Sequence, residues 1–298
     1  MTTIAVLGAG SVGVYFAAHL AAVGQDVVAC VRRGFERYQV DSPEAPVEGP
    51  AHAVVDPDQI SAPVEFVLLC VKAHQTPGTA AWLARLCNAD TTVVVVQNGV
   101  EGAQRAQPLV GAATVLPAVV YCGAELLEPG HIRHYARGTI FTPDEPVAHR
   151  LAALFQGSGA QLVPTAAFLE EAWRKLATNT IVNGVSALTL RDLRVMAEPG
   201  MAELAQAIGT EAYAVARAEG ADLGEHGLAK LIAMLKGSGA SGTSMLYDRR
   251  AGRPLEHDAL YGAVLRAASR HGIDVPLHRA LSTLLAACSP APETPVAG

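Results

Sequence analysis

Over the first 140 residues, short hydrophobic runs alternate with polar or glycine breaks and with helical stretches. Such alternation predicts a parallel sheet with helices on its faces. Several runs are hydrophobic at every position, as in strands that helices cover on both sides. The predicted strands are Ile4–Leu7, Val27–Val31, Ala53–Val55, Phe66–Val71, Thr92–Val96 and Val115–Tyr121. The stretch His131–Phe141 follows the turn pair Pro129-Gly130 and is predicted to add antiparallel at the sheet edge.

From about Thr165 onward, the hydrophobic spacing becomes that of helices. The predicted helices are Phe168–Leu190, Met201–Glu219, His226–Leu235, His257–His271 and Leu277–Cys288. The change follows the break Gly157-Ser158-Gly159 and falls near Val163-Pro164. We therefore predict an α/β fold with three parts. These are an N-terminal Rossmann domain with a doubly wound sheet (1–164), an all-helical C-terminal domain (165–288) and a flexible Pro-rich tail (289–298).

Composition narrows the class of protein. A length of 298 residues suits two domains, and 22 Lys+Arg against 28 Asp+Glu argue against a nucleic-acid partner. The first hydrophobic run stops at Gly8, far too short to cross a membrane. Five scattered cysteines without a C-x-x-C pair indicate neither a disulfide framework nor a thiolate metal site. We expect a cytoplasmic, soluble protein without a metal.

The first predicted strand runs into a glycine-rich turn that opens a helix, composed of Gly8, Ala9, Gly10, Ser11, Val12 and Gly13. The first glycine of such a motif permits a tight turn, the second lets the backbone approach a pyrophosphate, and the third lets helix and strand pack closely. The alternative is an ordinary strand-to-helix turn. The position at the start of a βαβ pattern favours dinucleotide binding.

The residues after the second predicted strand bear on which dinucleotide is bound. NAD-preferring sites place Asp or Glu there to bind the ribose 2′-hydroxyl. This chain instead has Arg32 and Arg33, with no acid before Glu36. A guanidinium offers a fixed fork of donors to a 2′-phosphate, so NADP(H) is favoured. Alternatively, the two arginines are solvated loop residues.

Two further predicted strands run directly into polar residues. One ends at Lys72, and the next at Gln97-Asn98-Gly99. Carboxyl ends of parallel strands line the ligand crevice in an open α/β sheet. Lys72 and Asn98 are therefore candidates near the cofactor or substrate, although Asn-Gly is also common in turns.

A stripe of polar residues follows one face of the long helix predicted at Phe168–Leu190. Lys175, Asn179 and Asn183 are spaced four residues apart, and Ser186 comes three later. At about 100° per residue they share one face between hydrophobic flanks. Such a stripe is typical of the wall of a polar pocket, whereas a solvated face would carry paired charges. A surface helix with an uncharged stripe is the alternative.

Two later segments carry further candidates. Glu256 opens a predicted helix, where an acid is favoured by the helix dipole even without a function. The Gly/Ser-rich loop 237–244 lacks the lysine of a phosphate-binding P-loop. Its hydroxyl groups are available to a small anionic ligand.

Several motifs in this order resemble the ketopantoate reductase (2-dehydropantoate 2-reductase) family over nearly the whole chain. The matching residues are the glycine turn, Val71-Lys72-Ala73, Gln75-Thr76, Gln97-Asn98-Gly99-Val100, Lys175, Asn179, Asn183, Thr243-Ser244-Met245, Asp248, Glu256, Gly272-Ile273 and Pro276. Each motif is weak alone, but their order and spacing are specific. The resemblance implies a Rossmann domain, a helical domain that could also form a homodimer, and reduction of a small 2-keto acid by NADPH.

The resemblance also assigns roles. Lys175 matches the family's catalytic lysine, which protonates the ketone oxygen as hydride reaches C2, and Glu256 matches the acid beside substrate and cofactor. The matched substrate-binding positions are Asn98, Asn179, Asn183 and Ser244. The matched or expected cofactor-binding positions are Gly8–Gly13, Arg32, Lys72, Asn98 and Glu256.

The chain departs from the family pattern at three places. It reads Leu190-Arg191-Asp192-Leu193-Arg194 where the family commonly has a glycine and a further Asn, and it has Tyr247 and His257 where an amide and an aliphatic residue are expected. Arg191 or Arg194 could serve a different acid or lie on the surface. Two alternatives therefore remain open: a related hydroxyacid dehydrogenase acting on another small acid, and a catalytically silent NADP-binding sensor.

Overall fold

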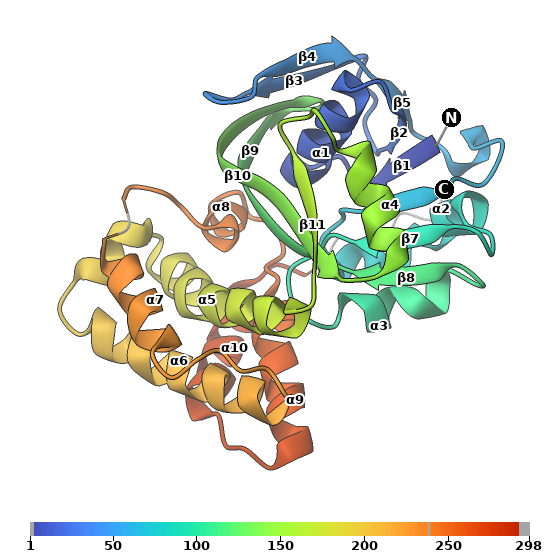
Figure 1. The fold of residues 1–298 in the computed structure, drawn as a ribbon. Coiled ribbons are helices and arrows are strands. Elements are labelled where there is room, and N and C mark those ends of the chain that lie inside the picture. Colours follow the sequence, from blue (N-terminus) through green and yellow to red (C-terminus); the bar gives the residue numbers. More distant parts are fainter. Residues whose placement is uncertain (1–2, 238, 292–298) are drawn as a thin grey trace. The chain divides into compact units, whose positions relative to one another are not determined.

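The computed structural model describes residues 3–237 and 239–291 (Figure 1). The chain forms two compact units. One comprises Met1–Asn98 and Gly102–Phe168, and the other comprises Gly99–Glu101 and Leu169–Gly298. The predicted tail begins at Ser289, and its residues 292–298 lie outside the described residues.

A parallel sheet forms the centre of the first unit. Its strands, in spatial order, are β5 (His52–Val54), β2 (Asp26–Cys30), β1 (Thr3–Leu7), β6 (Phe66–Leu69), β7 (Thr92–Val95) and β8 (Thr114–Pro117). Each neighbouring pair is parallel. In chain order this is the 3-2-1-4-5-6 arrangement of a doubly wound dinucleotide-binding sheet. The predicted Rossmann fold is confirmed.

Both faces of this sheet are buried, as the uninterrupted hydrophobic strands require. On β1, Ile4 and Val6 enter one core with helix α1 (Ser11–Ala22), while Ala5 and Leu7 enter the other. That second core also takes side chains from α2 (Ala80–Leu86) and α3 (Gly102–Ala106). The other helical segments described in this unit are η1 (Pro57–Gln59), η2 (Ala73–Thr79), η3 (Gln107–Leu109) and α4 (Pro146–Leu154).

A second sheet covers the outer side of α1. Its strands are β3 (Arg37–Asp41), β4 (Val47–Pro50), β9 (Val119–Glu128), β10 (His131–Pro143) and β11 (Gln161–Thr165). The prediction that His131–Phe141 adds antiparallel to the edge of the first sheet is wrong, because β10 pairs antiparallel with β9 and parallel with β3 and β11. The reason lies in α1, which buries every residue from Gly13 to Leu20 and so needs hydrophobic cover on both sides (Figure 1).

The second unit is helical, as predicted. Its helices are α5 (Phe168–Thr189), η4 (Leu193–Ala197), α6 (Met201–Ala218), α7 (Gly227–Lys236), α8 (Ser244–Arg250), η5 (Asp258–Gly262), α9 (Ala263–His271) and α10 (Pro276–Cys288). Helix α8 was not predicted. The helix predicted from His257 begins with a π-helical turn, η5, before α9.

Helix α5 lies at the centre of this unit. Ile181 and Val185 belong to one hydrophobic core with α6 and α7, while Trp173 and Leu176 belong to another with η5 and α9. Its middle is therefore buried from several sides, which makes each polar side chain there costly unless it finds a partner. In the part of the chain that the structure describes, no helix meets the length and hydrophobicity needed to span a membrane.

Buried His19 links α1 to the segment before β11. Its ring is 1% exposed, and its Nδ1 accepts a hydrogen bond from the backbone N–H of Gly159 at 3.2 Å. Burial, with a smaller contribution from His134, lowers the pKa of His19 from 6.5 to about 4. The ring is therefore neutral at pH 7.

Acid should destabilise the protein partly through His19. Because its pKa is lower in the folded state, the stabilisation is present above pH 6.5 and is lost as the pH falls towards 4. The loss should be about 2 kcal/mol, allowing for screening by water near the ring. Urea unfolding at pH 7.0, 5.5 and 4.5 should show a shallower pH dependence for His19→Gln than for the wild type. Equal pH dependence in the two proteins would contradict this assignment.

Candidate functional site

The glycine turn between β1 and α1 is set by close backbone approaches. Gly8 has φ +98°, and its N–H donates to the Cys30 carbonyl at 3.0 Å. A Cβ on Gly8 would lie 2.6 Å from Cγ1 of Val71, and one on Gly13 would lie 2.1 Å from the Gly8 carbonyl oxygen. The protein's own packing therefore requires glycine at both positions.

Gly10 is different, because a Cβ there would meet no atom within 4 Å. Its φ of −74° suits any residue. Gly10 is the N-cap of α1, the position directly before the N–H groups of the first helical turn. An open space at a helix N-terminus fits a pyrophosphate, and protein packing gives no other reason for this glycine.

The two arginines lie at the same sheet edge as this turn. Leu7 of β1 is in register with Cys30 of β2, and Arg32 and Arg33 directly follow the buried Val31. Both arginine side chains are exposed. They can therefore reach an anionic group at the edge where β1 and β2 end.

A buried glutamine organises the chain around Lys72 and Asn98. Gln97 is 6% exposed, and its Nε2 donates to the Val71 carbonyl at 3.0 Å and to Oγ1 of Thr76 at 2.9 Å. It thus fastens the end of β7 to the segment after β6. Lys72 and Asn98, on either side of this bridge, are half-buried. Sequence reasoning named Gln97 only as part of a motif and missed this supporting role.

Most of the polar stripe on α5 is buried inside the helical unit. Asn179, Asn183 and Ser186 are buried, while Lys175 is half-buried. The Ser186 and Thr243 hydroxyls lie 2.6 Å apart, and Asn183 Oδ1 accepts from the N–H of Met245 at the long limit of 3.5 Å.

These contacts hold the beginning of α8 against α5. Thr243 is the N-cap of α8, and its Oγ1 accepts from the N–H of Leu246 at 3.1 Å. Ser244, the first residue of α8, is exposed. The predicted substrate positions Asn183 and Ser244 are therefore brought together around one helix start.

Glu256 precedes the π-helical turn, which is also docked on α5. Glu256 is 6% exposed, and Tyr261 of η5 donates its hydroxyl to the Thr180 carbonyl at 2.6 Å. Gly184 makes room for this contact, since a Cβ there would lie 2.1 Å from the Tyr261 oxygen. Burial raises the pKa of Tyr261, so the phenol remains a neutral donor. The segment after Glu256 thus meets α5 between Asn179 and Asn183.

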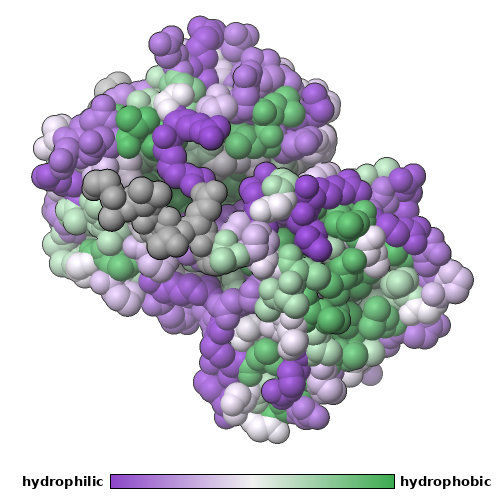
Figure 2. Space-filling model, turned by 180° about the vertical axis from the view of Figure 1, so that it is seen from behind, coloured by the Kyte–Doolittle hydropathy of each residue, from purple (hydrophilic) through white to green (hydrophobic). Residues whose placement is uncertain are grey.

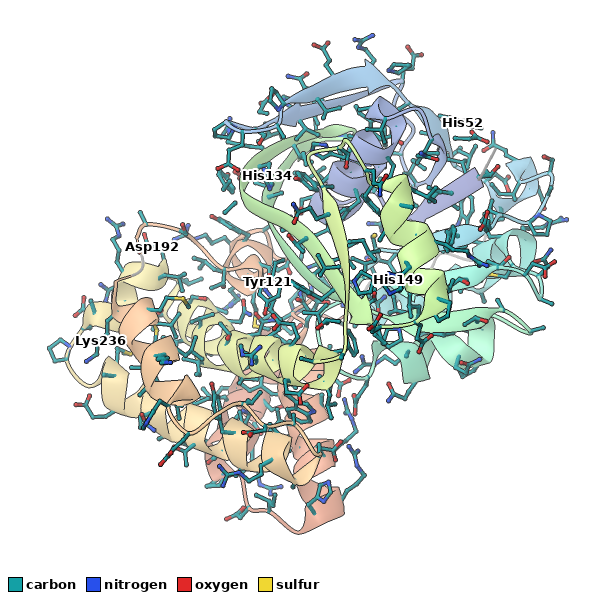
Figure 3. All side chains as sticks on the ribbon, in the orientation of Figure 1. His52, Tyr121, His134, His149, Asp192 and Lys236 are labelled. Carbon is teal, nitrogen blue, oxygen red and sulfur yellow. The ribbon has the colours of Figure 1, made fainter. Side chains whose placement is uncertain are left out.

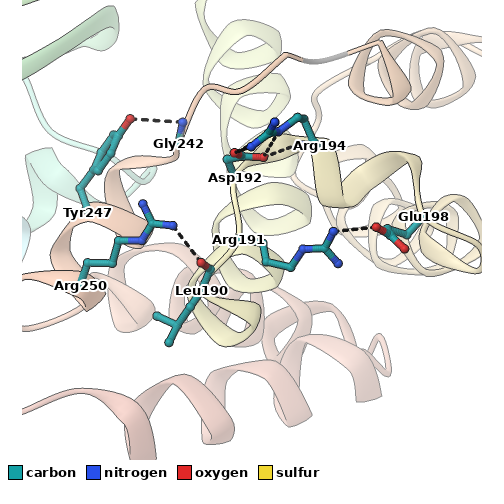
Figure 4. Close-up of polar contacts among 8 residues, drawn as sticks. All are labelled: Leu190, Arg191, Asp192, Arg194, Glu198, Gly242, Tyr247 and Arg250. Carbon is teal, nitrogen blue, oxygen red and sulfur yellow. Dashed lines mark hydrogen bonds and ion pairs between the residues drawn. The ribbon is translucent and has the colours of Figure 1, made fainter.

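The segment Leu190–Arg194, which departs from the family pattern, directly follows the C-terminal end of α5 (Figure 4). Arg191 pairs with Glu198 at 2.6 Å, Arg194 pairs with Asp192, and Arg250 donates to the Leu190 carbonyl at 2.9 Å. Leu190 has φ +56°, the left-handed conformation that glycine adopts more easily. The guanidinium groups of Arg191 and Arg194 are thus engaged by neighbouring carboxylates.

His19 and His134 both lie against the Tyr15 ring, but His131 and His134 have different polar partners. Figure 3 shows His52, His134 and His149 on separate elements and apart from one another. His131 binds Asp41 at 2.9 Å, while His134 lies 3.1 Å from the Ser42 hydroxyl. Among the described residues, no group of three His, Cys, Asp or Glu side chains is placed to hold a metal ion.

The candidate residues thus form two sets. The first unit holds the glycine turn, Arg32, Lys72 and Asn98, and the helical unit holds Lys175, Asn179, Asn183, Ser244 and Glu256. A doubly wound sheet with an open helix N-terminus is the half that binds a dinucleotide. The helical unit carries a lysine one helical turn before two buried amides, a combination that can polarise a carbonyl group. A dinucleotide-binding sheet and a helix of this kind are features of nicotinamide-dependent oxidoreductases.

The comparisons with known proteins specify the family. The profile "Ketopantoate reductase PanE/ApbA" matches residues 4–145, and "Ketopantoate reductase PanE/ApbA C terminal" matches residues 167–289. The chain belongs to the ketopantoate reductase family, as its sequence motifs indicated. It is therefore an NADP-dependent oxidoreductase that acts on a CH–OH group.

Curated relatives extend over the whole chain. A 2-dehydropantoate 2-reductase from Mycobacterium tuberculosis is 36% identical over 295 residues, covering 98% of this chain and 99% of the relative. One from Caulobacter vibrioides is 35% identical over 291 residues, covering 97% and 100%. The solved 2-dehydropantoate 2-reductase of Geobacter metallireducens is 27% identical with a TM-score of 0.90, covering 96% of this chain and all of that one.

Alanine substitutions at Gly10 and at Gly13 should have different effects. Gly10→Ala meets no protein atom, so we expect a melting temperature close to that of the wild type and NADPH binding weaker by about tenfold or more, because the methyl group occupies the pyrophosphate space. Gly13→Ala meets a backbone oxygen and should lower the melting temperature by several degrees. Thermal unfolding and NADPH fluorescence titration measure the two effects. Unchanged NADPH affinity in Gly10→Ala would contradict the assignment.

Proposed function

We propose that this chain is a 2-dehydropantoate 2-reductase that reduces the C2 ketone of 2-dehydropantoate to (R)-pantoate with NADPH. The observation that carries the proposal is the face of α5, where Lys175 precedes two buried amides in a chain 36% identical to a reductase of that name. The domain division at residues 164 and 165, with substrate binding and dimerisation in the helical part, belongs to the same proposal.

The cofactor is assigned to the first unit. The N–H groups at the start of α1 would bind the pyrophosphate above Gly10, and Arg32 would bind the 2′-phosphate. Lys72 and Asn98 follow strand ends at the same edge of the sheet and would contact the cofactor further along. When bound, NADPH supplies the hydride for C2.

Lys175 is assigned as the proton donor. Reduction places negative charge on the ketone oxygen, and an ammonium group within hydrogen-bond distance stabilises that charge and delivers the proton. Its half-buried position on α5 leaves the amino group access to a ligand, while the next turns of the helix are buried. Solvent then returns the proton to the amine.

The remaining polar residues would position the substrate. Asn98, Asn179 and Asn183 can each donate and accept hydrogen bonds, and Ser244 presents an exposed hydroxyl at the start of α8. Glu256 would accept a hydrogen bond from a substrate hydroxyl beside the cofactor. Holding the keto acid in one orientation lowers the entropic part of the barrier to hydride transfer.

Cytoplasmic location and a homodimer complete the proposal. All five cysteines are free thiols, which suits a reducing compartment. The helical unit exposes Leu169, Met234 and Leu284, and Figure 2 shows hydrophobic residues gathered on one face of it. Exposed hydrophobic area of this kind is available for subunit contact.

Removing the ammonium group tests the assignment of Lys175. Lys175→Met should lower kcat for 2-dehydropantoate by about 10² to 10⁴-fold, the usual contribution of general acid catalysis, and leave NADPH affinity nearly unchanged. The matched control is Lys236→Met, which changes an exposed lysine at the end of α7 (Figure 3). Steady-state rates and NADPH titration measure both. Wild-type turnover by Lys175→Met would refute the mechanism, and no turnover of any keto acid by the wild type would favour the silent sensor.

Cofactor preference tests the assignment of Arg32 to the 2′-phosphate. We expect Arg32→Ala to raise the KM for NADPH by about tenfold and to leave that for NADH within about twofold, because only NADPH carries the 2′-phosphate. Arg85→Ala is the control, since Arg85 pairs with Asp58 at an exposed position on α2. Equal effects of Arg32→Ala on both cofactors would show that Arg32 does not bind the 2′-phosphate. A panel of keto and hydroxy acids with both cofactors distinguishes the reductase from a related hydroxyacid dehydrogenase.

A further inference from the structure

The segment directly after Asn98 belongs to the helical unit. Gly99–Glu101 groups with Leu169–Gly298, whereas Asn98 and Gly102 on either side belong to the Rossmann unit. The chain therefore leaves the first unit for three residues and returns. Asn98, a proposed substrate and cofactor contact, is covalently bonded to a segment that packs elsewhere.

Two packing contacts hold Gly99–Glu101 in the helical unit. A Cβ on Gly99 would lie 2.5 Å from the Ala259 carbonyl oxygen of η5, and Gly99 itself has φ +95°. Val100 packs against the hydrophobic core that contains Leu260 and Val264. The backbone after Asn98 thus runs along η5 at a distance that only glycine permits.

A three-residue ion cluster holds the end of the segment. Arg266 Nε donates to Glu101 Oε1 at 2.9 Å and Arg266 Nη2 to Oε2 at 2.6 Å, a paired arrangement of parallel bonds. The same guanidinium binds Asp258 through Nη1 at 2.7 Å. The Glu101 side chain is 18% exposed and that of Arg266 is 44% exposed, so the pair is partly shielded from water. We call these three residues the Glu101 clasp.

The clasp is continuous with the polar face of α5. Asp258 is the first residue of η5, two positions after Glu256. Tyr261 of the same turn binds the Thr180 carbonyl of α5 at 2.6 Å. One short element therefore receives the segment after Asn98 and also anchors on α5 between Asn179 and Asn183.

We propose that Glu101 is a positioning residue for reduction: through Arg266 and Asp258 it fixes the segment that follows Asn98 to the turn that follows Glu256. This inference rests on the proposed function, because it concerns the same reaction. A fixed end on the Asn98 segment limits how Asn98 can reorient when substrate is present. Loss of the clasp should therefore act on turnover, while the glycine turn and Arg32 continue to bind NADPH.

The test compares Glu101→Gln, Arg266→Met and the double variant in the full-length protein. We expect kcat/KM for 2-dehydropantoate to fall about tenfold in each single variant, as small misplacements of binding groups do, with NADPH affinity within about twofold of the wild type. The double variant should have the same kcat/KM as the single variants, because both changes remove one shared interaction. The control is Glu219→Gln, which removes the ion pairs of Glu219 with Arg270 and His271 in the same unit.

Two measurements separate this proposal from the proposed function. Amide hydrogen exchange of the peptide spanning residues 98–102 should become faster in Glu101→Gln than in the wild type, whatever the activity. Wild-type turnover of 2-dehydropantoate is measured first, and its absence would refute the proposed function alone. Unchanged exchange in Glu101→Gln would overturn the clasp, as would unchanged turnover in an active enzyme. An equal fall in turnover in Glu219→Gln would also overturn it.

Discussion

The close packing of α1 on β1 is the constraint from which the Rossmann unit follows. The backbones at Gly8 and Gly13 approach so closely that neither tolerates a Cβ, and this places the start of α1 at the carboxyl end of the sheet. The helix that follows is buried on all sides, so it requires a second hydrophobic layer beyond the first sheet. The strands β3, β9 and β10 supply that layer through Tyr38, Val120 and Ile132. Among the three glycines of the turn, Gly10 is the one without a packing reason, and the proposed pyrophosphate would account for it.

The helical unit is organised by polar groups inside a hydrophobic helix. Burying Asn179, Asn183 and Ser186 would cost free energy unless they find partners. The start of α8 contacts Ser186, and Tyr261 of η5 contacts the Thr180 carbonyl in the same stretch of α5. Structural contacts and the proposed ligand contacts therefore meet on the same stretch of α5. Lys175 lies one turn before the buried amides, at a half-buried position where a charge can be retained and still meet a ligand.

Features encoded within short stretches of sequence could be predicted. The glycine turn, the run of buried strands and the stripe from Lys175 to Ser186 each depend on spacing within a few turns or strands. The second sheet could not be predicted in this way, because β3 contributes only Tyr38 and Val40 as inward residues and pairs with β10 some ninety residues later. Contacts such as Glu101 with Arg266 join residues 165 positions apart and leave no local pattern. Likewise, Gln97 looks like a turn residue until its bond with Thr76 is seen.

The direct test of the central claim follows the transferred hydrogen. Purified protein would be incubated with 2-dehydropantoate and NADPH deuterated at C4 of the nicotinamide, and the product examined by mass spectrometry and NMR. The proposed reaction predicts pantoate carrying one deuterium at C2, formed in equal amount to the NADPH oxidised. NADPH oxidation without deuterium at C2, or tight NADPH binding with no pantoate formed, would contradict it.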